Sequence, residues 1–295
     1  MRARRLRAGD RVRLVSPASF PDAGWADQVA ATLAGWELRP EVGSAALARH
    51  GFMAGRDEDR LADLNAAFRD PGIRAVVTTT GGAGAYRIVD GIDFDAVRSD
   101  PKPLIGFSDI TNLHLALWAR TGLATVHGCV GTGGRTDESA RRLLFDPGPL
   151  TVHASPEPPL TVAGRAAGIL VGGNAGAMSN FVGAGLPDLD GTIVLLEGAQ
   201  NPHFDRFLWA LRRGGALRGV RGFAIGDMAG LDPSVADPGP ESAVEVLRDR
   251  VAGLGVPVLS GLPIGHLPGQ VCVPLGTTAT IDTDAGTLTA ESAVS

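Results

Sequence analysis

Short apolar runs alternate along the first half of the chain with longer segments whose apolar residues recur every three or four positions. The short runs are rich in branched side chains, which predicts buried strands at residues 12–16, 75–79 and 104–105. The longer segments carry one apolar face each, which predicts helices at 26–36, 57–68 and 110–119. Strands that alternate with helices are typical of βαβ units and of a mostly parallel sheet.

The periodic pattern is lost over residues 135–167, where five prolines fall between positions 147 and 159. Because proline interrupts both helices and strands, we expect a Pro-rich linker at 136–167, between an N-terminal domain (1–135) and a C-terminal domain (168–295). The pattern then resumes, with strands predicted at 169–171, 192–196, 222–225 and 256–259, helices at 204–211 and 242–254, and an antiparallel β finish over 271–288. The predicted fold class is α/β, a doubly wound, mostly parallel N-terminal sheet followed by a smaller C-terminal α/β domain with a β-rich end.

Composition narrows the classes of protein. The 295 residues are 44% hydrophobic and carry a net charge of −5, the balance of a globular protein without strong electrostatic attraction for nucleic acid. The sequence contains no stretch of eighteen apolar residues, so we expect no membrane span. Arg11 and Arg13 interrupt the first apolar run, so we expect no signal peptide and a cytoplasmic location. Cys129 and Cys272 share no close spacing, so we predict small buried side chains, with a catalytic cysteine as the alternative, and no metal or cofactor.

Polar residues follow several predicted strands, where α/β proteins place their sites. A strand that ends at Gly106, then Ser108 and an immediate helix, is the layout of a nucleophile elbow, a sharp turn that presents a hydroxyl above the sheet. The match is partial, because Ile110 stands where the usual pattern has its second glycine. The alternative is that Ser108 is a helix N-cap.

Three other strand ends carry candidate groups. Gly81, Gly82 and Gly84, before a helix predicted from Ala85, could cradle a phosphate, supply an oxyanion-hole N–H, or form a bare tight turn. Arg87 replaces the third glycine of a dinucleotide fingerprint, and the phosphate-loop lysine is missing, which disfavours a nucleotide fold. Glu197 ends an apolar strand and His266 lies in a glycine-flanked loop. Glu197 could belong to a structural ion pair, but a Ser, a His and a carboxylate at strand ends also permit nucleophilic catalysis.

Several motifs together resemble one known family, the LD-carboxypeptidases. This family of serine peptidases includes muramoyl-tetrapeptide carboxypeptidases and microcin C self-immunity hydrolases. The resemblance runs nearly end to end and rests on GDRVRLVSPAS (9–19), the segment 54–87, DPKPLIGFSDIT (100–111), TVHG (125–128), GGN (172–174), DRFLWAL (205–211) and IGH (264–266). Its most specific part is the Gly-x-Ser-Asp elbow followed, in chain order, by Glu and then His.

The resemblance implies a role for each candidate. Ser108 would be the nucleophile, His266 the general base and Glu197 the carboxylate that orients His266. The N–H groups of Asp109 and Gly82 would form the oxyanion hole. With Ser108 in one domain and the other two in the second, the resemblance implies a site that assembles across a domain cleft, and a homodimer.

The sequence departs from the family at positions expected to contact substrate. Muramoyl-peptide enzymes usually carry an Arg before the Gly–Gly turn and a Tyr within it, where this chain has Thr80 and Ala83 beside Gly81. The segment after Glu197, residues 198–200, is also less acidic than usual.

The resemblance leaves three functions open. The first is hydrolysis of an amide next to a terminal residue, most simply the L,D bond of a murein tetrapeptide with release of D-Ala. The second is cleavage of a peptide- or aminoacyl-nucleotide conjugate, for self-immunity. A binding protein with a decayed site is the third, but Ser108, Glu197 and His266 are all present. The expected partner is a small peptide or peptide conjugate, without nucleic acid or membrane.

Overall fold

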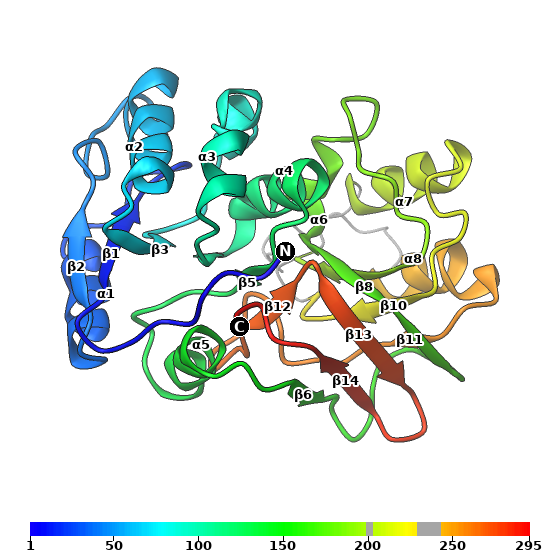
Figure 1. The fold of residues 1–295 in the computed structure, drawn as a ribbon. Helices are drawn as coiled ribbons and strands as arrows, with labels where there is room; N and C mark the ends of the chain where they lie inside the picture. Colours follow the sequence, from blue (N-terminus) through cyan, green and yellow to red (C-terminus); the bar gives the residue numbers. More distant parts are fainter. Residues whose placement is uncertain (199–202, 229–242) are drawn as a thin grey trace. The chain divides into compact units, whose positions relative to one another are not determined.

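The computed structural model describes residues 1–198, 203–228 and 243–295, and this part of the chain forms two compact units (Figure 1). Unit 1 comprises Met1–Gly148 together with two returning segments, Val271–Gly276 and Ser292–Ser295. Unit 2 comprises Pro149–Gln270 and Thr277–Glu291. The expected Ser108 thus lies in unit 1, and Glu197 and His266 lie in unit 2.

Unit 1 is built on a six-stranded sheet in the order β12-β5-β4-β3-β1-β2. Its strands are β1 (Arg11–Val15), β2 (Arg39–Val42), β3 (Ile73–Thr78), β4 (Leu104–Gly106), β5 (Thr125–His127) and β12 (Val273–Leu275). Every pairing is parallel except β12 with β5. A parallel order in which the chain reverses direction beside β1 is a doubly wound sheet, with its switch point between β1 and β3.

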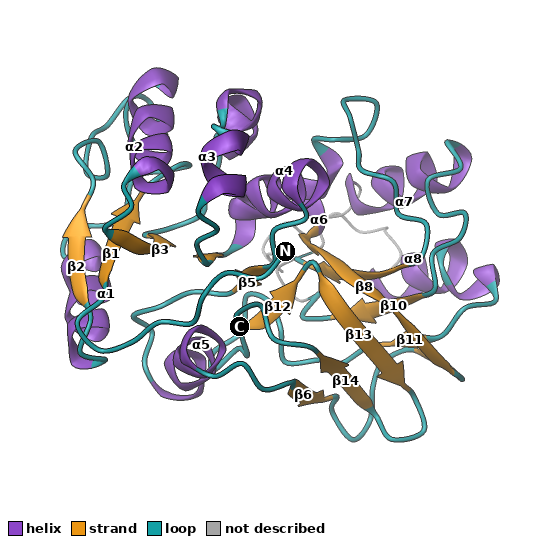
Figure 2. Ribbon diagram, in the orientation of Figure 1, coloured by secondary structure: helices purple, strands orange, loops and turns teal. Residues whose placement is uncertain are grey.

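Helices cover both faces of this sheet. In Figure 2, α2 (Asp57–Arg69), α3 (Phe94–Ser99) and α4 (Thr111–Thr121) lie on one side, and α1 (Trp25–Gly35) and α5 (Gly134–Phe145) lie on the other. Two 3₁₀ helices, η1 (Ala85–Gly91) and η2 (Ser108–Ile110), follow β3 and β4. The predicted α/β fold class with a mostly parallel sheet is confirmed.

The outer strand β2 escaped the sequence pattern because it is an edge strand. Its residues Arg39–Val42 are half-buried or exposed, and it contains a proline, which an edge tolerates. Arg11 and Arg13 of β1 pair with Glu41 at 2.5 and 3.1 Å. The neighbouring β1 shows the expected alternation, because Val12 and Leu14 are fully buried. Charges on an edge also disfavour pairing with another chain.

Unit 2 is built on an eight-stranded mixed sheet in the order β6-β14-β13-β8-β9-β10-β11-β7. The strands are β6 (Leu150–His153), β7 (Thr161–Val162), β8 (Arg165–Asn174), β9 (Thr192–Glu197), β10 (Gly222–Ile225), β11 (Val258–Leu259), β13 (Thr277–Asp282) and β14 (Thr287–Ala290). Strands β8 to β11 run parallel, whereas β13 and β14 form the antiparallel hairpin expected at the end of the chain. The helices of this unit are α6 (Ala175–Ser179), α7 (His203–Arg213), α8 (Ala243–Arg250) and the 3₁₀ helix η3 (Ala252–Leu254).

Three local expectations differ from the structure. The segment 136–167 is not without regular structure, because it contains most of α5, all of β6 and β7, and the start of β8. Helix α5 buries Thr136, Ala140 and Leu143 at steps of four and three, a face that its polar residues obscure in the sequence. The helix expected from Ala85 is a 3₁₀ helix. The helix expected over 242–254 ends at Arg250, and its first residue, Ser242, lies outside the described residues.

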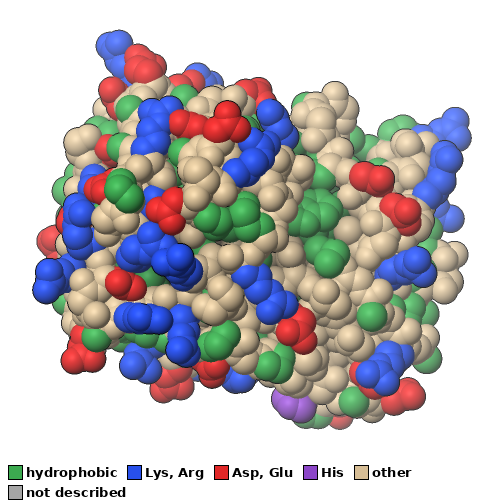
Figure 3. Space-filling view, viewed as in Figure 1, with side chains coloured by type: hydrophobic (Ala, Val, Ile, Leu, Met, Phe, Trp, Pro, Cys, Tyr) green, Lys and Arg blue, Asp and Glu red, His purple; other side chains and the backbone are tan. Residues whose placement is uncertain are grey.

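Basic and acidic side chains are interspersed on the face of the molecule drawn in Figure 3. Neighbouring charges of opposite sign weaken each other's field, so this face carries mixed rather than single-sign potential. Among the residues with described positions, no helix is both long and apolar enough to cross a lipid bilayer.

Candidate functional site

The sharp turn between β4 and α4 holds Ser108 in a strained backbone conformation. Ser108 has φ 61°, and among the described residues only Glu37 shares a positive φ without being glycine. The left-handed region costs such residues about 1–2 kcal/mol, and a strained residue between a strand and a helix is typical of a nucleophile elbow. Ser108 does not stand at an N-cap position, because that position is Phe107 for η2 and Ile110 for α4. The Ser108 side chain is half-buried.

The glycine turn after β3 packs directly against this elbow. A Cβ atom on Gly81 would lie 2.8 Å from the Phe107 carbonyl oxygen, 2.8 Å from the Ser108 Cβ and 3.3 Å from the Asp109 nitrogen. Only glycine fits at such a distance, because real Cβ atoms need more than 3 Å. The turn is therefore more than a chain reversal, since its first glycine allows the backbone to approach Ser108 closely.

Ser19, in the loop after β1, fixes the rest of the glycine turn. Its N–H donates to the Gly81 carbonyl (3.0 Å), and its hydroxyl oxygen accepts from the Ala83 N–H (3.1 Å). Gly82 has φ 92°, and a Cβ there would lie 2.2 Å from the Ser19 Oγ. Gly81 is buried, Thr80 and Ala83 are half-buried and Gly82 is exposed, so three of the four predicted turn residues reach the surface.

Asp109 follows the elbow serine and is 7% exposed. Burial raises the pKa of its carboxyl group, against the lowering effects of the Ala85 N–H, the charge of Arg60 and the Asn112 side chain. Its oxygens accept from the Ala85 N–H (2.8 Å) and from Asn112 Nδ2 (2.9 Å). The side chain of Asp109 thus joins the elbow to the chain that leaves the glycine turn.

In unit 2, Glu197 at the end of β9 forms a hydrogen bond with His266, which lies in the loop after β11. Glu197 ends β9 and is fully buried, and its Oε2 lies 2.8 Å from His266 Nδ1. The sequence separation is 69 residues, so only the fold brings them together. With Nδ1–H directed at the carboxylate, the other ring nitrogen, Nε2, is the one placed to accept a proton. The contact between Glu197 and His266 is therefore expected both for a structural ion pair and for a catalytic pair.

The surroundings of His266 favour its protonated form. Burial lowers the pKa of His266, but the hydrogen bond to Glu197 and the charges of Glu197 and Asp227 outweigh it, and the pKa is raised above the usual 6.5. Asp227 follows β10, and its N–H donates to the Ile264 carbonyl in the histidine loop (2.6 Å). Asp227 was not singled out as a candidate group from the sequence. Its position after a buried strand, like that of Glu197, was the available signal.

Gly265 lets the histidine loop approach the glutamate closely. Its φ is 123°, and a Cβ there would lie 3.0 Å from the Asp227 Cβ and 3.2 Å from Glu197 Oε2. A side chain at this position would separate His266 from its partner. Asn174, the last residue of the GGN motif, stands opposite Glu197 in the β8–β9 register and caps α6 through Ala177, a placement that its motif alone did not predict. Residues 199 and 200 of the segment after Glu197 lie outside the described positions.

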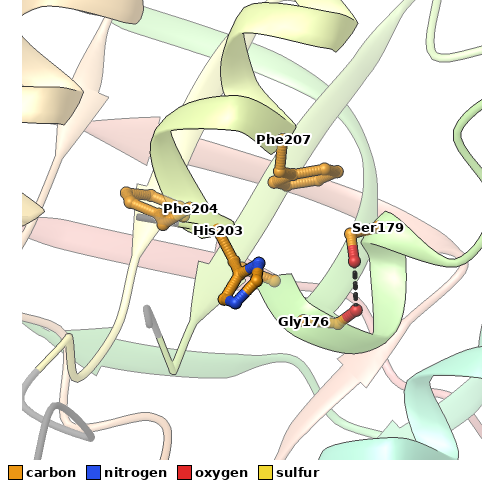
Figure 4. Close-up of a pocket in the computed structure, with 6 residues that line it drawn as sticks. Gly176, Ser179, His203, Phe204 and Phe207 are labelled. Carbon is orange, nitrogen blue, oxygen red and sulfur yellow. Dashed lines mark hydrogen bonds between the residues drawn. The ribbon is translucent and has the colours of Figure 1, made fainter. Parts of the chain in front are cut away.

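A small cavity of about 40 Å³ lies between α6 and α7 (Figure 4). The Ser179 hydroxyl donates to the Gly176 carbonyl (2.6 Å) on one side, and His203, Phe204 and Phe207 of α7 line the other. A space of this size holds a few water molecules and no peptide. It is a packing gap beside the strand end that carries Asn174.

The two cysteines do not form a reactive site. Cys272 is buried and Cys129 half-buried. Burial raises the pKa of the Cys272 thiol to about 12 and that of Cys129 to about 11. A thiol that stays protonated at neutral pH is a poor nucleophile, which disfavours the catalytic alternative for both.

A buried histidine under the elbow makes stability depend on pH. His114 of α4 is 2% exposed and contacts the Gly106 carbonyl through Nε2 (3.0 Å), and burial lowers its pKa to about 4. The unfolded chain binds this proton near pH 6.5, so the stabilisation is fully present above pH 6.5 and declines as the pH falls towards 4, by roughly 3 kcal/mol in all. The free energy of unfolding, measured with urea at pH 5 and at pH 7.5, tests this loss of stability. We expect His114→Gln to reduce the difference in unfolding free energy between the two pH values. The control His50→Gln, at an exposed position, should keep the wild-type difference. An equal difference in all three proteins would contradict the prediction.

Models of two protein domains match the chain. The LD-carboxypeptidase N-terminal domain matches residues 12–128, and the LD-carboxypeptidase C-terminal domain matches residues 167–281. The chain is 35% identical to the probable murein peptide carboxypeptidase of Bacillus subtilis, over 98% of this chain and 94% of that protein. It is 32% identical to the murein tetrapeptide carboxypeptidase of Pseudomonas aeruginosa, over 92% of this chain and 93% of that protein.

Solved structures share the fold. The microcin C7 self-immunity protein in complex with aspartyl sulfamoyl adenosine superposes with a TM-score of 0.85 and 21% identity, and the match covers 100% of both chains. At this identity the likeness concerns the arrangement of the backbone.

Proposed function

Because the chain belongs to the LD-carboxypeptidase family, we propose that it hydrolyses the amide bond next to a terminal residue of a small peptide, with Ser108 as the nucleophile. The conformation of Ser108 carries the proposal. A serine held at φ 61° between a buried strand and a helix is strained in the way that exposes a nucleophile, and it does not stand at the N-cap position.

Each step of the reaction has a group to perform it. His266 takes the Ser108 proton on Nε2 as the oxygen attacks the carbonyl carbon, and Glu197 holds the ring through Nδ1 and stabilises the imidazolium. The N–H groups of Asp109 and Gly82 stabilise the oxyanion, at about 2.7–4 kcal/mol per donor. The imidazolium then gives its proton to the leaving amine, and a water molecule, deprotonated by His266, hydrolyses the acyl-enzyme.

A murein tetrapeptide is the first substrate that we propose. The Pseudomonas aeruginosa relative is named for this substrate and matches nearly the whole chain. We propose that the enzyme cleaves the L,D bond and releases the terminal D-Ala, with Thr80, Gly81 and Ala83 near the bound substrate. The homodimer and the cytoplasmic location that the resemblance implies stay predictions.

Thr80 favours a second candidate substrate, a peptide- or aminoacyl-nucleotide conjugate. Muramoyl-peptide enzymes usually have an arginine at this position, and threonine removes a positive charge that would bind a substrate carboxylate. An Escherichia coli relative named a microcin C7 self-immunity protein is 24% identical over 79% of this chain.

Mass spectrometry of the purified protein with each compound tests both substrates. Loss of one D-Ala from a murein tetrapeptide supports the first, and release of aspartate from aspartyl sulfamoyl adenosine supports the second. Cleavage of neither compound would contradict both substrate assignments.

Replacing Glu197 by glutamine is expected to lower kcat/KM by about 10⁴-fold, because the amide orients the wrong imidazole tautomer and carries no charge. The remaining activity should also change its pH profile. The base must be neutral, so activity is lost as the pH falls through the pKa of His266, which Glu197 raises. The acid limb of kcat/KM should therefore move to lower pH in Glu197→Gln.

Asp282→Asn is the matched control, because Asp282 pairs with Arg165 at the far end of the β8–β13 ladder. We expect Asp282→Asn to leave the acid limb of kcat/KM at the same pH as in the wild-type protein. A Glu197→Gln protein that fails to fold would indicate a structural ion pair instead.

A further inference from the structure

The peptide group between Gly84 and Ala85 is held on both sides by buried charged side chains. Arg60 Nη1 donates to the Gly84 carbonyl oxygen at 3.0 Å, and the Ala85 N–H donates to Asp109 Oδ2 at 2.8 Å. Arg60 is 1% exposed and Asp109 is 7% exposed. Hydrogen bonds to charged groups are roughly twice as strong as neutral ones, so this peptide plane is fixed at the end of the glycine turn.

Arg60 ties three segments together. Its guanidinium extends from α2, donates to the Pro17 carbonyl in the loop after β1, pairs with Asp57, and lies 3.3 Å from the Met53 sulfur. Burying such a charge costs free energy that an apolar side chain would not, and buried ion pairs often add little net stability. What the arginine supplies here is position, because its planar donors fix two loop carbonyls at once.

Asp109 is fixed just as firmly on the elbow side. Asn112 Nδ2 donates to both the backbone oxygen (2.7 Å) and the Oδ1 atom (2.9 Å) of Asp109. The carboxylate therefore cannot rotate independently of its own backbone. Through Oδ2 it then holds Ala85, so the residue that follows the nucleophile also holds the exit of the glycine turn.

We propose that Arg60 and the Asp109 side chain form a clamp on the Gly84–Ala85 peptide that sets the separation of the two oxyanion donors, the N–H groups of Asp109 and Gly82. The clamp rests on the proposed function, since it assigns Arg60 and the Asp109 side chain as positioning residues for that reaction. Gly82 and Gly84 have φ values of 92° and 115°, so the turn has little stiffness of its own; Ser19 holds Gly81 and Ala83, and the clamp holds the exit of the turn at Gly84 and Ala85. The donors must lie 2.7–3.1 Å from the oxyanion, and a displacement of about 1 Å can cost on the order of 10²-fold in rate.

The oxyanion exists only in the transition state, so loosening the clamp should lower kcat and leave KM nearly unchanged. We expect Asp109→Asn to reduce kcat by about 10- to 100-fold with KM within about twofold. Arg60→Met should behave similarly, and Arg60→Lys should recover part of the rate, because an ammonium group can still donate to one carbonyl. The substrate is whichever compound the wild-type protein cleaves.

Arg74→Gln is the matched control. Arg74 pairs with Asp100 at 3.2 Å in the same unit but lies at the start of β3, whereas the glycine turn follows its end. We expect wild-type kcat and KM. Binding measured in a Ser108→Ala background should have the same Kd with and without Asp109→Asn, which a general disruption of the site would not preserve.

The outcomes separate the clamp from the proposed function. A folded Asp109→Asn protein with wild-type kcat, or with a loss confined to KM, overturns the clamp. If the Arg60→Met protein does not fold, the kcat and KM values of the Asp109→Asn and Arg60→Lys proteins still test the clamp. An inactive Ser108→Ala protein beside fully active clamp variants overturns the clamp alone, whereas a fully active Ser108→Ala protein overturns the proposed function.

Discussion

The Ser108→Ala variant is expected to lose turnover by on the order of 10⁶-fold while it folds and binds substrate normally. Alanine removes only the hydroxyl oxygen, and Ser108 is half-buried at the surface of unit 1, so little packing changes. The remaining groups can still bind the substrate and polarise its carbonyl, which leaves a residual rate above that of water. Mass spectrometry of a murein tetrapeptide, incubated with wild-type and variant protein, measures the loss directly.

Ser99→Ala is the appropriate control for this variant. Ser99 ends α3 and donates to the Ala96 carbonyl at 2.9 Å, so the change removes an equivalent hydroxyl from the same unit. The Ser99→Ala protein should cleave the tetrapeptide at the wild-type rate. The thermal unfolding midpoint of the Ser108→Ala protein should equal that of the wild type. Equal cleavage by the wild-type and Ser108→Ala proteins would mean that the strained serine is structural and that the reaction uses another nucleophile.

Replacing His266 by alanine should cost nearly as much, again on the order of 10⁶-fold in kcat. Without a base, the Ser108 proton has no acceptor during attack, and the leaving amine has no donor afterwards. Residues that act as one unit give losses that do not add. The Ser108→Ala/His266→Ala double variant should therefore be no slower than either single variant.

The control for this second variant is His153→Ala, an exposed histidine on β6 of the same unit. It should retain full activity. Losses that multiply in the double variant would contradict the shared mechanism, because they would show that Ser108 and His266 act in separate steps. Retained activity in His266→Ala would assign the base to another group.

Most of the strands that were predicted from sequence are buried on both faces. Strand β9 is buried at every position, and β3 at all but one, so their apolar runs are continuous and easy to recognise. Strand β2 and helix α5 were missed for the opposite reason: an edge strand and a surface helix expose polar residues, and the burial that distinguishes them is set by neighbours distant in sequence. The tail strand β12 joins the sheet of unit 1, which no local pattern indicates.

The candidate site divides in the same way. Ser108, Glu197 and His266 each follow a strand or a glycine, so their positions could be predicted. The contact of Glu197 with His266 could not, because it spans 69 residues. Arg60 was missed because an arginine on an amphipathic helix is expected at the surface, and only the long-range contacts with Pro17 and Gly84 explain its burial.

The return of the C-terminal segments to unit 1 has a consequence for synthesis on the ribosome. Strand β12 completes the six-stranded sheet, and Ala3 is bridged to Val294, one residue from the end of the chain. The sheet that carries the turn between β4 and α4 therefore cannot be completed until residues 271–276 have emerged, although the turn itself is made early. Native contacts between such distant residues slow folding and leave a sheet edge open meanwhile. A nascent chain that stops before β12 thus contains Ser108 without a finished sheet around it.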